Sequence, residues 1–184
     1  MFCFIDFETT GVDIFRDEPI EFGAILCDKD LKIIRQFSSL ISLEKKINIK
    51  KAAFAIHKIN SNDLLSSPKS KAVLDNFFNE FGVDYRFVGW NINFDVSFFR
   101  KLCHKNGMMI RYNKINHRHI DVQSICFLAN KLKLFPMQLS CLSQVAEYFK
   151  IERSEKHSAL EDAIITFKVY SNLLTLFKSR LKEN

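Results

Sequence analysis

The amino-acid sequence predicts an α/β protein whose mixed five-stranded sheet is flanked by helices. Two observations carry this prediction. Three strand-like segments separated by short polar stretches fill residues 2–43, and strand-like and helix-like segments alternate from residue 69 onward. Consecutive strands joined by short turns form antiparallel pairs, whereas strands joined through helices are commonly parallel and covered on both faces. We therefore expect antiparallel pairing among the first three strands and helices on both sides of the sheet.

Apolar segments rich in β-forming residues are the expected strands. The first, Phe2–Ile5, contains neither Gly nor Pro, which favours a buried strand. The polar turn Asp28-Lys-Asp30 is short enough to join the second and third strands as an antiparallel pair. The expected strands are Phe2–Ile5, Ile20–Cys27, Ile33–Leu43, Arg86–Trp90 and Arg118–Asp121.

Helices are expected where apolar residues recur three and four positions apart. From Lys69 to Phe81 this spacing is followed by Gly82, and glycine commonly ends helices. The expected helices are Asn48–Ile56, Asn62–Leu65, Lys69–Phe81, a segment capped by Asn93 and running to about Lys105, Val122–Lys133, Ser140–Phe149 and Ser158–Leu181. On the last helix the expected buried stripe is Ile164, Phe167, Tyr170, Leu174, Phe177 and Leu181.

Length and composition suit a single domain spanning residues 1–184. The chain has a mass of 21.5 kDa and 47% hydrophobic residues, enough for one sizeable core. Its five cysteines are scattered without a C-x-x-C pair, which argues against a disulfide framework or a zinc site. No apolar run reaches transmembrane length and no signal peptide precedes the first strand, so we expect a soluble, cytoplasmic protein without a membrane partner.

The charge balance favours a polyanionic partner. The chain carries 27 Lys and Arg against 21 Asp and Glu, which gives a formal net charge of +6 and a pI near 9.1. A basic surface attracts nucleic acids, although many basic proteins bind none. If several carboxylates gather in one site, the remaining surface is more basic than the net charge indicates.

Two carboxylates at the end of the first expected strand are candidate metal ligands. Asp6 and Glu8 are two residues apart, and side chains alternate along a strand, so both point to one face. Like charges held that close repel unless a cation neutralises them, and Mg²⁺ prefers oxygen ligands of this kind. Gly11 lets the following backbone bend or approach a ligand closely. Taken alone, the pair fits equally with solvated carboxylates in a turn.

Two later segments place more acidic residues at helix starts. Asp95 falls in the first turn of its expected helix, where the macrodipole favours the ionised form that a metal ligand must take. Ser158 with Glu161 forms a capping-box pattern, which leaves His157 on a loop and Asp162 just inside the last helix. Each segment alone fits with an ordinary helix-start Asp or an exposed loop His.

The three segments together resemble the motifs of the DEDDh family of 3′→5′ exonucleases. This family includes the epsilon proofreading subunit of bacterial DNA polymerase III. The matching segments, in chain order, are Ile5-Asp-Phe-Glu-Thr-Thr-Gly11, Asn91-Ile-Asn-Phe-Asp95 and His157-Ser-Ala-Leu-Glu-Asp-Ala163. The resemblance spans residues 2–177 and implies a ribonuclease-H-like fold, which agrees with the expected mixed sheet. The sequence departs from the family at Trp90, where relatives often carry His, and at Lys58, where they usually carry Gly.

The resemblance implies a role for each motif residue. It implies that Asp6, Glu8, Asp95 and Asp162 hold two Mg²⁺ or Mn²⁺ ions and that His157 is the general base. A sister group carries Tyr at the position of His157, so the His selects the DEDDh branch. Two ions activate a water and stabilise the leaving 3′ oxygen in such enzymes. The resemblance also implies that the 3′-terminal nucleotide contacts Thr9, Thr10, Gly11, Ile56, His57, Asn91 and Phe94.

The function expected from the resemblance is removal of nucleoside 5′-monophosphates from DNA 3′ ends, in proofreading or repair. Single-stranded or frayed ends are the expected substrate, and a polymerase is a possible partner. Two alternatives remain open. One is an exonuclease that trims RNA 3′ ends, and the other is a non-catalytic nucleic-acid-binding module on the same fold.

Overall fold

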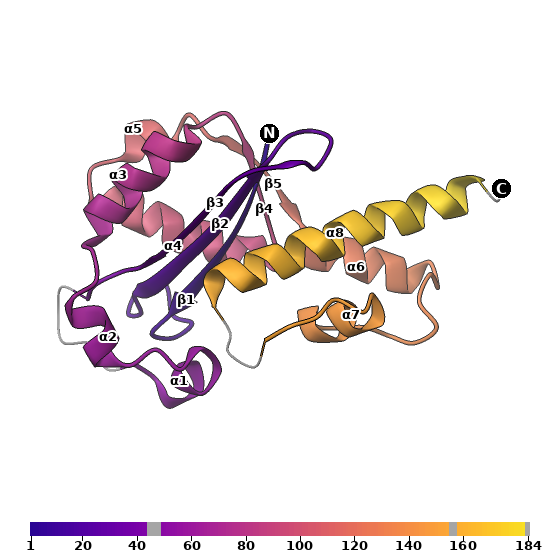
Figure 1. Ribbon diagram of the computed structural model, residues 1–184, viewed down its shortest axis with the longest axis horizontal. Helices are drawn as coiled ribbons and strands as arrows, with labels where there is room; N and C mark the ends of the chain where they lie inside the picture. Colours follow the sequence, from indigo (N-terminus) through magenta and orange to yellow (C-terminus); the bar gives the residue numbers. More distant parts are fainter. Residues whose placement is uncertain (44–48, 155–157, 183–184) are drawn as a thin grey trace.

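The computed structural model describes residues 1–43, 49–154 and 158–182, and the strands among them form one five-stranded sheet (Figure 1). The strand order is β3-β2-β1-β4-β5. The strands are β1 (Phe2–Thr9), β2 (Pro19–Cys27), β3 (Ile33–Leu40), β4 (Arg86–Gly89) and β5 (Asn116–Asp121). The sheet pairs β1 with β2 and β2 with β3 antiparallel, and β1 with β4 and β4 with β5 parallel. The predicted mixed sheet with three antiparallel leading strands is therefore confirmed.

The two neighbours of β1 accompany it over different lengths. β2 pairs with β1 as far as Thr9, whereas the last residue of β1 paired with β4 is Phe4. The first strand therefore continues beyond the predicted end at Ile5, and Asp6 and Glu8 lie inside it rather than after it. Because β4 ends early, one edge of β1 is left for groups other than a strand.

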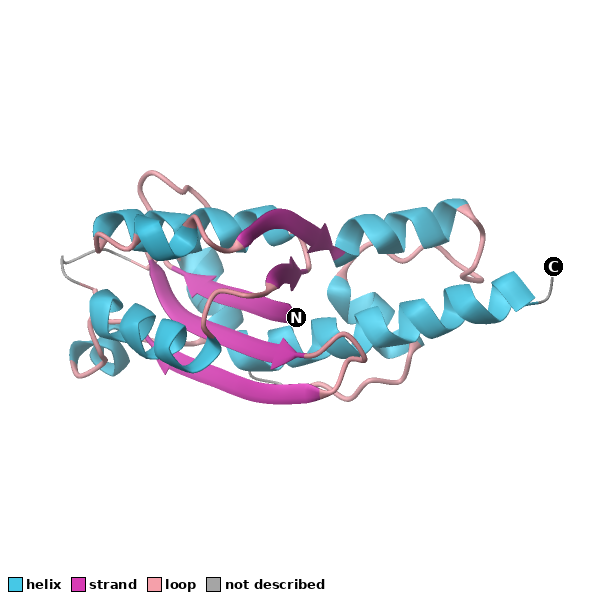
Figure 2. Ribbon diagram, turned by 90° about the horizontal axis from the view of Figure 1, so that it is seen from above, coloured by secondary structure: helices cyan, strands magenta, loops and turns pink. Residues whose placement is uncertain are grey.

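Helices cover both faces of the sheet. The helices are α1 (Lys51–His57), α2 (Ser61–Leu65), α3 (Ser70–Phe81), α4 (Ile92–Lys105), α5 (Met109–Tyr112), α6 (Val122–Lys131), α7 (Leu142–Tyr148) and α8 (Ala159–Lys182). One hydrophobic cluster joins the sheet to α3 and α4, and a second joins it to α6, α7 and α8. The long α8 crosses the sheet and projects beyond it toward the C-terminus (Figures 1 and 2). The sequence did not predict the four-residue helix α5. No helix in the described residues is long and apolar enough to cross a membrane.

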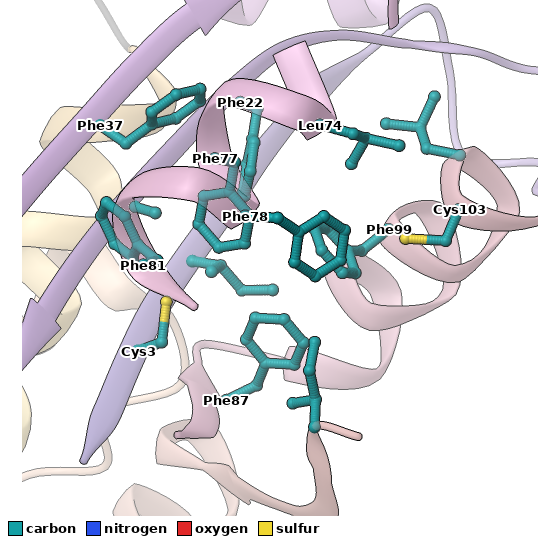
Figure 3. Packing of buried hydrophobic residues seen from close by; sticks show 14 of the residues in the cluster. Cys3, Phe22, Phe37, Leu74, Phe77, Phe78, Phe81, Phe87, Phe99 and Cys103 are labelled. Atoms are coloured by element: carbon teal, nitrogen blue, oxygen red, sulfur yellow. The ribbon is translucent and has the colours of Figure 1, made fainter. Parts of the chain in front are cut away.

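Alternation along β1 divides its side chains between the two clusters. Cys3, Ile5 and Phe7 belong to the cluster with α3 and α4, whereas Phe4 belongs to the cluster with α8. Asp6 and Glu8 share the parity of Phe4 and so point to the α8 face. The opposite face is built largely from phenylalanine rings (Figure 3), and the rings of Phe7 and its strand partner Phe22 stack 4.4 Å apart.

The first turn of α8 lies directly on β2 at Gly23. A Cβ atom added to Gly23 would come within 2.1 Å of the Leu160 backbone nitrogen and 2.2 Å of the Ala159 carbonyl carbon. Small residues of α8 consequently face the sheet, and Ala159 and Ala163 are fully buried.

The predicted apolar stripe of α8 is confirmed in part. Tyr170 is buried, Ile164, Phe167, Leu174 and Phe177 are partly buried against the same cluster, and Leu181 is 78% exposed. The fully buried positions Ile165, Val169 and Leu173 lie beside the predicted ones, so the stripe is centred about one residue away, and the exposed Leu181 lies on the part of α8 that projects beyond the sheet (Figure 1).

The substitution Gly23→Ala should displace the first turn of α8, because the new methyl group would overlap backbone atoms that cannot rotate away. We expect the free energy of unfolding, measured in urea, to fall by about 3 kcal/mol or more. The matched control is Gly107→Ala. Its φ of +71° strains a side chain, but nothing lies within 4 Å of the added Cβ, so the loss there should be nearer ~1 kcal/mol. Equal losses at the two positions would contradict the close contact.

Candidate active site

Three carboxylates from two distant parts of the chain meet on the α8 face of the sheet. Asp6 and Glu8 come from β1, and Asp162 comes from the first turn of α8. One oxygen of each lies within 4.8 Å of the others, a spacing at which the three could hold a metal ion. Glu8 and Asp162 are each only 9% exposed, and Asp6 is partly buried. Strand alternation and the approach of α8 over Gly23 together produce this group.

The carboxylates raise one another's pKa values. Burial raises the pKa of Asp6 well above its usual range, and the charges of Asp95, Asp162, Glu8 and Glu21 raise it further. Burial also raises the pKa of Glu8 to about 8, together with the charges of Asp162 and Glu21, while Arg153 opposes the shift. A divalent cation that prefers oxygen ligands neutralises carboxylates held this close together.

Asp95 lies next to the three-carboxylate group, at the edge of β1 that faces away from β2. It lies in the first turn of α4, is 2% exposed, and its Oδ1 accepts a hydrogen bond of 3.0 Å from the Phe7 backbone N–H. Phe7 stands between Asp6 and Glu8, on the stretch of β1 that β4 no longer accompanies. Burial raises the pKa of Asp95 well above its usual range, and the hydrogen bond from Phe7 partly offsets this effect.

The cap of α4 differs from the predicted one. Asn91, not Asn93, is the N-cap residue, and it adopts a left-handed conformation with φ of 56°. The exposed Asn91 is held through its backbone N–H, which donates to Asp121 Oδ1 at 2.9 Å. The turn that delivers Asp95 is therefore fixed by a carboxylate at the end of β5.

Arg153 supplies a cation beside the carboxylate group. Its Nη2 lies 2.6 Å from Oδ1 and 2.9 Å from Oδ2 of Asp162. The Arg153 side chain is 19% exposed, so the ion pair is shielded from solvent. No sequence pattern pointed to Arg153, because its contact depends on the path of the segment that precedes α8.

Glu21 is a further buried carboxylate that the sequence interpretation missed. It stands directly opposite Glu8 in the antiparallel pair of β1 and β2, and it is 9% exposed. Its Oε2 accepts a hydrogen bond of 3.2 Å from the Ala159 N–H, the first backbone amide of α8. A negative charge at a helix N-terminus satisfies an otherwise unpaired amide and interacts favourably with the macrodipole. The predicted antiparallel pairing of the first two strands was the signal that could have found it, had the register been assigned.

The predicted general base, His157, lies outside the described residues. On either side of that gap, Ser154 and Ser158 both contact Glu161. Ser158 Oγ accepts from the Glu161 N–H at 3.3 Å, as half of the predicted capping box requires. The Glu161 carboxylate, in contrast, accepts a hydrogen bond of 2.6 Å from the Ser154 N–H.

The segment Thr9–Gly11 is buried and tightly braced. Thr9 Oγ1 donates to the Gly11 carbonyl at 2.7 Å, and Thr10 Oγ1 donates to Asp17 Oδ1 at 3.2 Å. Asp17 in turn forms an ion pair with Lys50. A Cβ on Gly11 would lie 2.5 Å from Asp17 Oδ2, so these hydrogen bonds leave room only for glycine at this position.

The remaining predicted contact residues divide into buried and exposed groups. His57 ends α1, one residue beyond the predicted helix, and is 1% exposed. Its Nδ1 accepts a hydrogen bond of 2.9 Å from the Ile59 N–H, while its buried Nε2 has no hydrogen-bond partner among the described residues. Burial lowers the pKa of His57 and so favours its neutral form. Ile56 is 53% exposed, and Phe94 is partly buried with its ring 4.9 Å from that of Phe98.

Comparison with known proteins places the chain in a nuclease family. Residues 3–170 match the exonuclease family RNase_T, and the chain belongs to that family. The chain is 30% identical over 176 residues to the DNA polymerase III subunit epsilon of Aquifex aeolicus, an alignment that covers 94% of this chain and 80% of that protein. The predicted membership of a 3′→5′ exonuclease family is thereby confirmed.

Other relatives are much longer proteins. The chain is 28% identical over 173 residues to the PolC-type DNA polymerase III of Caldanaerobacter subterraneus, covering 94% of this chain but 11% of that protein. The crystal structure of Escherichia coli exonuclease I in complex with a dT13 oligonucleotide superposes with a TM-score of 0.82 at 20% identity, covering 99% of this chain and 42% of that chain. At this identity the likeness supports the fold alone.

In the metal-free protein, Asp6→Asn should raise the melting temperature at pH 8. A raised carboxyl pKa means that the folded protein retains a proton that the unfolded chain releases, so stability falls as pH rises from the usual carboxyl range toward pH 8. Removing one charge should flatten this decline and raise the melting temperature by at least about 2 °C. Differential scanning calorimetry in EDTA from pH 5 to pH 8 measures the effect.

The control for this variant is Asp17→Asn. Burial raises the pKa of Asp17, but hydrogen bonds from Lys50 and the Asp13 backbone outweigh it and lower the pKa below its usual value. Ionised Asp17 therefore stabilises the fold at neutral pH, and its loss should lower the melting temperature. A lower melting temperature in both variants would contradict the conclusion that repulsion among the carboxylates destabilises the metal-free protein.

Two substitutions at Glu21 separate its hydrogen bond from its charge. Glu21→Gln keeps an acceptor for the Ala159 N–H, whereas Glu21→Leu leaves that buried amide unpaired, at a cost of about 1–3 kcal/mol in the free energy of unfolding. We expect urea unfolding to show this loss only for the leucine variant. A glutamine variant as unstable as the leucine variant would show that the charge, not the hydrogen bond, holds the start of α8.

Proposed function

We propose that this protein is a metal-dependent 3′→5′ exonuclease that releases nucleoside 5′-monophosphates from DNA 3′ ends. The observation that carries the proposal is the buried group of Asp6, Glu8 and Asp162 with Asp95 alongside. Structural carboxylates are ordinarily dispersed or paired with cations, whereas these gather beside one end of β1, where Arg153 pairs with Asp162 and opposes the raised pKa of Glu8.

The donor set fits two hard divalent ions such as Mg²⁺ or Mn²⁺. The three clustered oxygens would hold the first ion, and Asp95 would extend the set toward a second. When bound, such ions supply stabilisation of the charge that develops on the phosphate and lower the pKa of an attacking water. Occupation would also offset the repulsion that raises the carboxylate pKa values, so metal should stabilise the fold.

The protein's own groups then orient the nucleotide and move the proton. The hydrogen-bonded Thr9–Gly11 segment presents a rigid wall for the terminal nucleoside, and the buried His57 imidazole lies next to the Thr9 backbone. His157 takes a proton from water as the water oxygen bonds to phosphorus, the bond from phosphorus to the 3′ oxygen of the preceding nucleotide breaks in line, and that oxygen takes a proton from solvent to become a hydroxyl. The products are a nucleoside 5′-monophosphate and a strand one nucleotide shorter.

DNA is the proposed substrate because relatives of this chain carry names of DNA polymerase III components. The same relationship supports a role in proofreading or repair and makes a polymerase a candidate partner. A lining of Thr and Gly at the terminal nucleotide does not by itself distinguish a deoxyribose from a ribose. RNA 3′-end trimming is therefore the alternative function, and an assay of matched DNA and RNA strands decides between the two.

The test is a time course on a single-stranded DNA oligonucleotide labelled at its 5′ end, with Mg²⁺ or Mn²⁺ and with EDTA. We expect a metal-dependent ladder that shortens from the 3′ end. The rate should fall by about 10²–10⁴-fold in His157→Ala, as for loss of a general base, and the ladder should be absent in Asp162→Asn. The matched carboxylate control is Asp75→Asn, whose side chain pairs on the surface with Lys71 and should leave the rate unchanged.

The same oligonucleotide in RNA is run beside the DNA, and the ratio of rates chooses between the two substrates. A folded protein that leaves both strands intact with either ion, yet binds them, would replace the exonuclease proposal by a non-catalytic binding role.

A further inference from the structure

A groove runs along α6 and the segment that follows it, and it begins at Trp90, the residue before Asn91. Its first part is a cavity of about 290 Å³ whose lining includes Trp90, Gln123, Phe127 and Gln138. Its second part is a cavity of about 270 Å³ that shares Phe127 and Gln138 and adds Lys131 and Lys133. The two cavities are adjacent, since Phe127 and Gln138 line both.

The groove is at the same edge and on the same face of the sheet as the carboxylates. Trp90 follows β4 directly, and Gln123 lies in the first turn of α6 after β5, so the groove begins at the carboxyl ends of the strands parallel to β1. Its wall residues Cys126 and Leu139 belong to the cluster shared with α8 and Phe4. Adjacent strands are about 4.8 Å apart, which puts β5 roughly 10 Å from β1.

The groove wall is preformed. The Asn130 amide donates to the Leu139 carbonyl at 2.7 Å and accepts from the Leu139 N–H at 3.0 Å, which ties α6 to the segment opposite. The nearby Asp121 carboxylate accepts hydrogen bonds from Asn91, Gln123 and Ser124, so its negative charge is already engaged by the protein.

The side chains of the groove match those of single-strand binding surfaces. Phe127 is 59% exposed and Trp90 partly buried, and both offer aromatic surface on which a base can stack. Lys131 Nζ lies over the Phe127 ring, 5.2 Å from its centre, so a positive charge stands at one face of this exposed ring. The exposed Lys133 adds a second positive charge, and the Gln123 and Gln138 amides add hydrogen-bonding groups.

We propose that this groove binds the single-stranded nucleic acid upstream of the 3′ end, with bases against Trp90 and Phe127 and phosphates near Lys131 and Lys133. The proposal deepens the proposed function, because it names where the strand leaves the site. Lysines and aromatic rings together favour a nucleic acid over an apolar peptide, which would need no cations beside the rings.

Binding is measured through Trp90, the only tryptophan in the chain, in EDTA so that nothing is hydrolysed. A twelve-nucleotide thymidine oligomer should quench Trp90 fluorescence. Phe127→Ala should weaken binding about fivefold or more. The double variant Lys131→Gln with Lys133→Gln should reduce the slope of log affinity against log salt by about 1.4, or about 0.7 for each phosphate that a lysine no longer neutralises.

The matched control is the double variant Lys29→Gln with Lys32→Gln. These exposed lysines lie in the β2–β3 turn, at the end of the sheet where Cys27 pairs with Phe2, and their loss changes the net charge equally. Affinity and salt slope should stay at the unmodified values. A control that weakens binding as much as the groove variant would show general electrostatic attraction and would overturn the proposal.

Hydrolysis separates this proposal from the proposed function. The p-nitrophenyl ester of thymidine 5′-monophosphate needs only the terminal-nucleotide site, so Phe127→Ala should cleave it at the unmodified rate while its KM for the twelve-nucleotide strand rises at least fivefold. If the unmodified protein cleaves neither the p-nitrophenyl ester nor the twelve-nucleotide strand, the proposed function is wrong. The fluorescence titration still tests the groove in that case. Unchanged titrations and an unchanged KM in both groove variants would overturn the groove proposal and leave this face to a protein partner.

Discussion

The contact of the α8 backbone with Gly23 is the constraint on which the site depends. Asp6 and Glu8 are placed by β1 alone, but Asp162 joins them only because α8 lies within van der Waals distance of the sheet at its first turn. A side chain on Gly23 would lift the start of α8 and with it the third carboxylate. Glu21 reinforces the same approach by accepting a hydrogen bond from the first amide of α8. One glycine and one glutamate of β2 therefore set the position of a residue about 140 positions away in the chain.

The site imposes an electrostatic cost that the rest of the fold must offset. Burial and mutual repulsion raise the pKa values of Asp6, Glu8 and Asp95, so in the absence of metal these groups destabilise the folded state at neutral pH. The opposite face of the sheet carries no such burden. There Phe22, Phe77 and Phe99 pack ring against ring among other fully buried apolar residues (Figure 3). Because side chains alternate along a strand, β1 contributes apolar side chains to the core on one face and the carboxylates Asp6 and Glu8 to the other face.

Features encoded locally could be predicted from the sequence. The alternation that aims Asp6 and Glu8 to one face is a property of any strand, and the apolar spacing of α3 and the antiparallel order of the first strands follow from neighbouring residues. The site residues stay predictions in their roles, although the structure brings Asp6, Glu8 and Asp162 together and sets Asp95 alongside.

Features that depend on distant contacts could not be predicted in this way. Arg153 pairs with Asp162, and no sequence pattern indicated that contact. The stripe of α8 was misplaced by about one residue because the packing of α8 on the sheet, including its contact with Gly23, sets which side of the helix is fully buried. The cap at Asn91 is fixed by Asp121, which lies 30 positions along the chain and belongs to β5.

The carboxylate group and the groove differ in how tightly the fold constrains them. Asp95 and Asp162 are buried and hydrogen-bonded, and each is positioned by a different helix, so a small shift in either helix would change the geometry of the site. The groove, in contrast, presents Phe127, Lys131 and Lys133 from the exposed side of α6 and its C-terminal end, where substitution leaves the core packing of Cys126 and Ala129 untouched. The proposed chemistry and the proposed strand affinity are therefore separable in this fold. Surface residues of α6 can change while the carboxylates stay fixed between β1, α4 and α8.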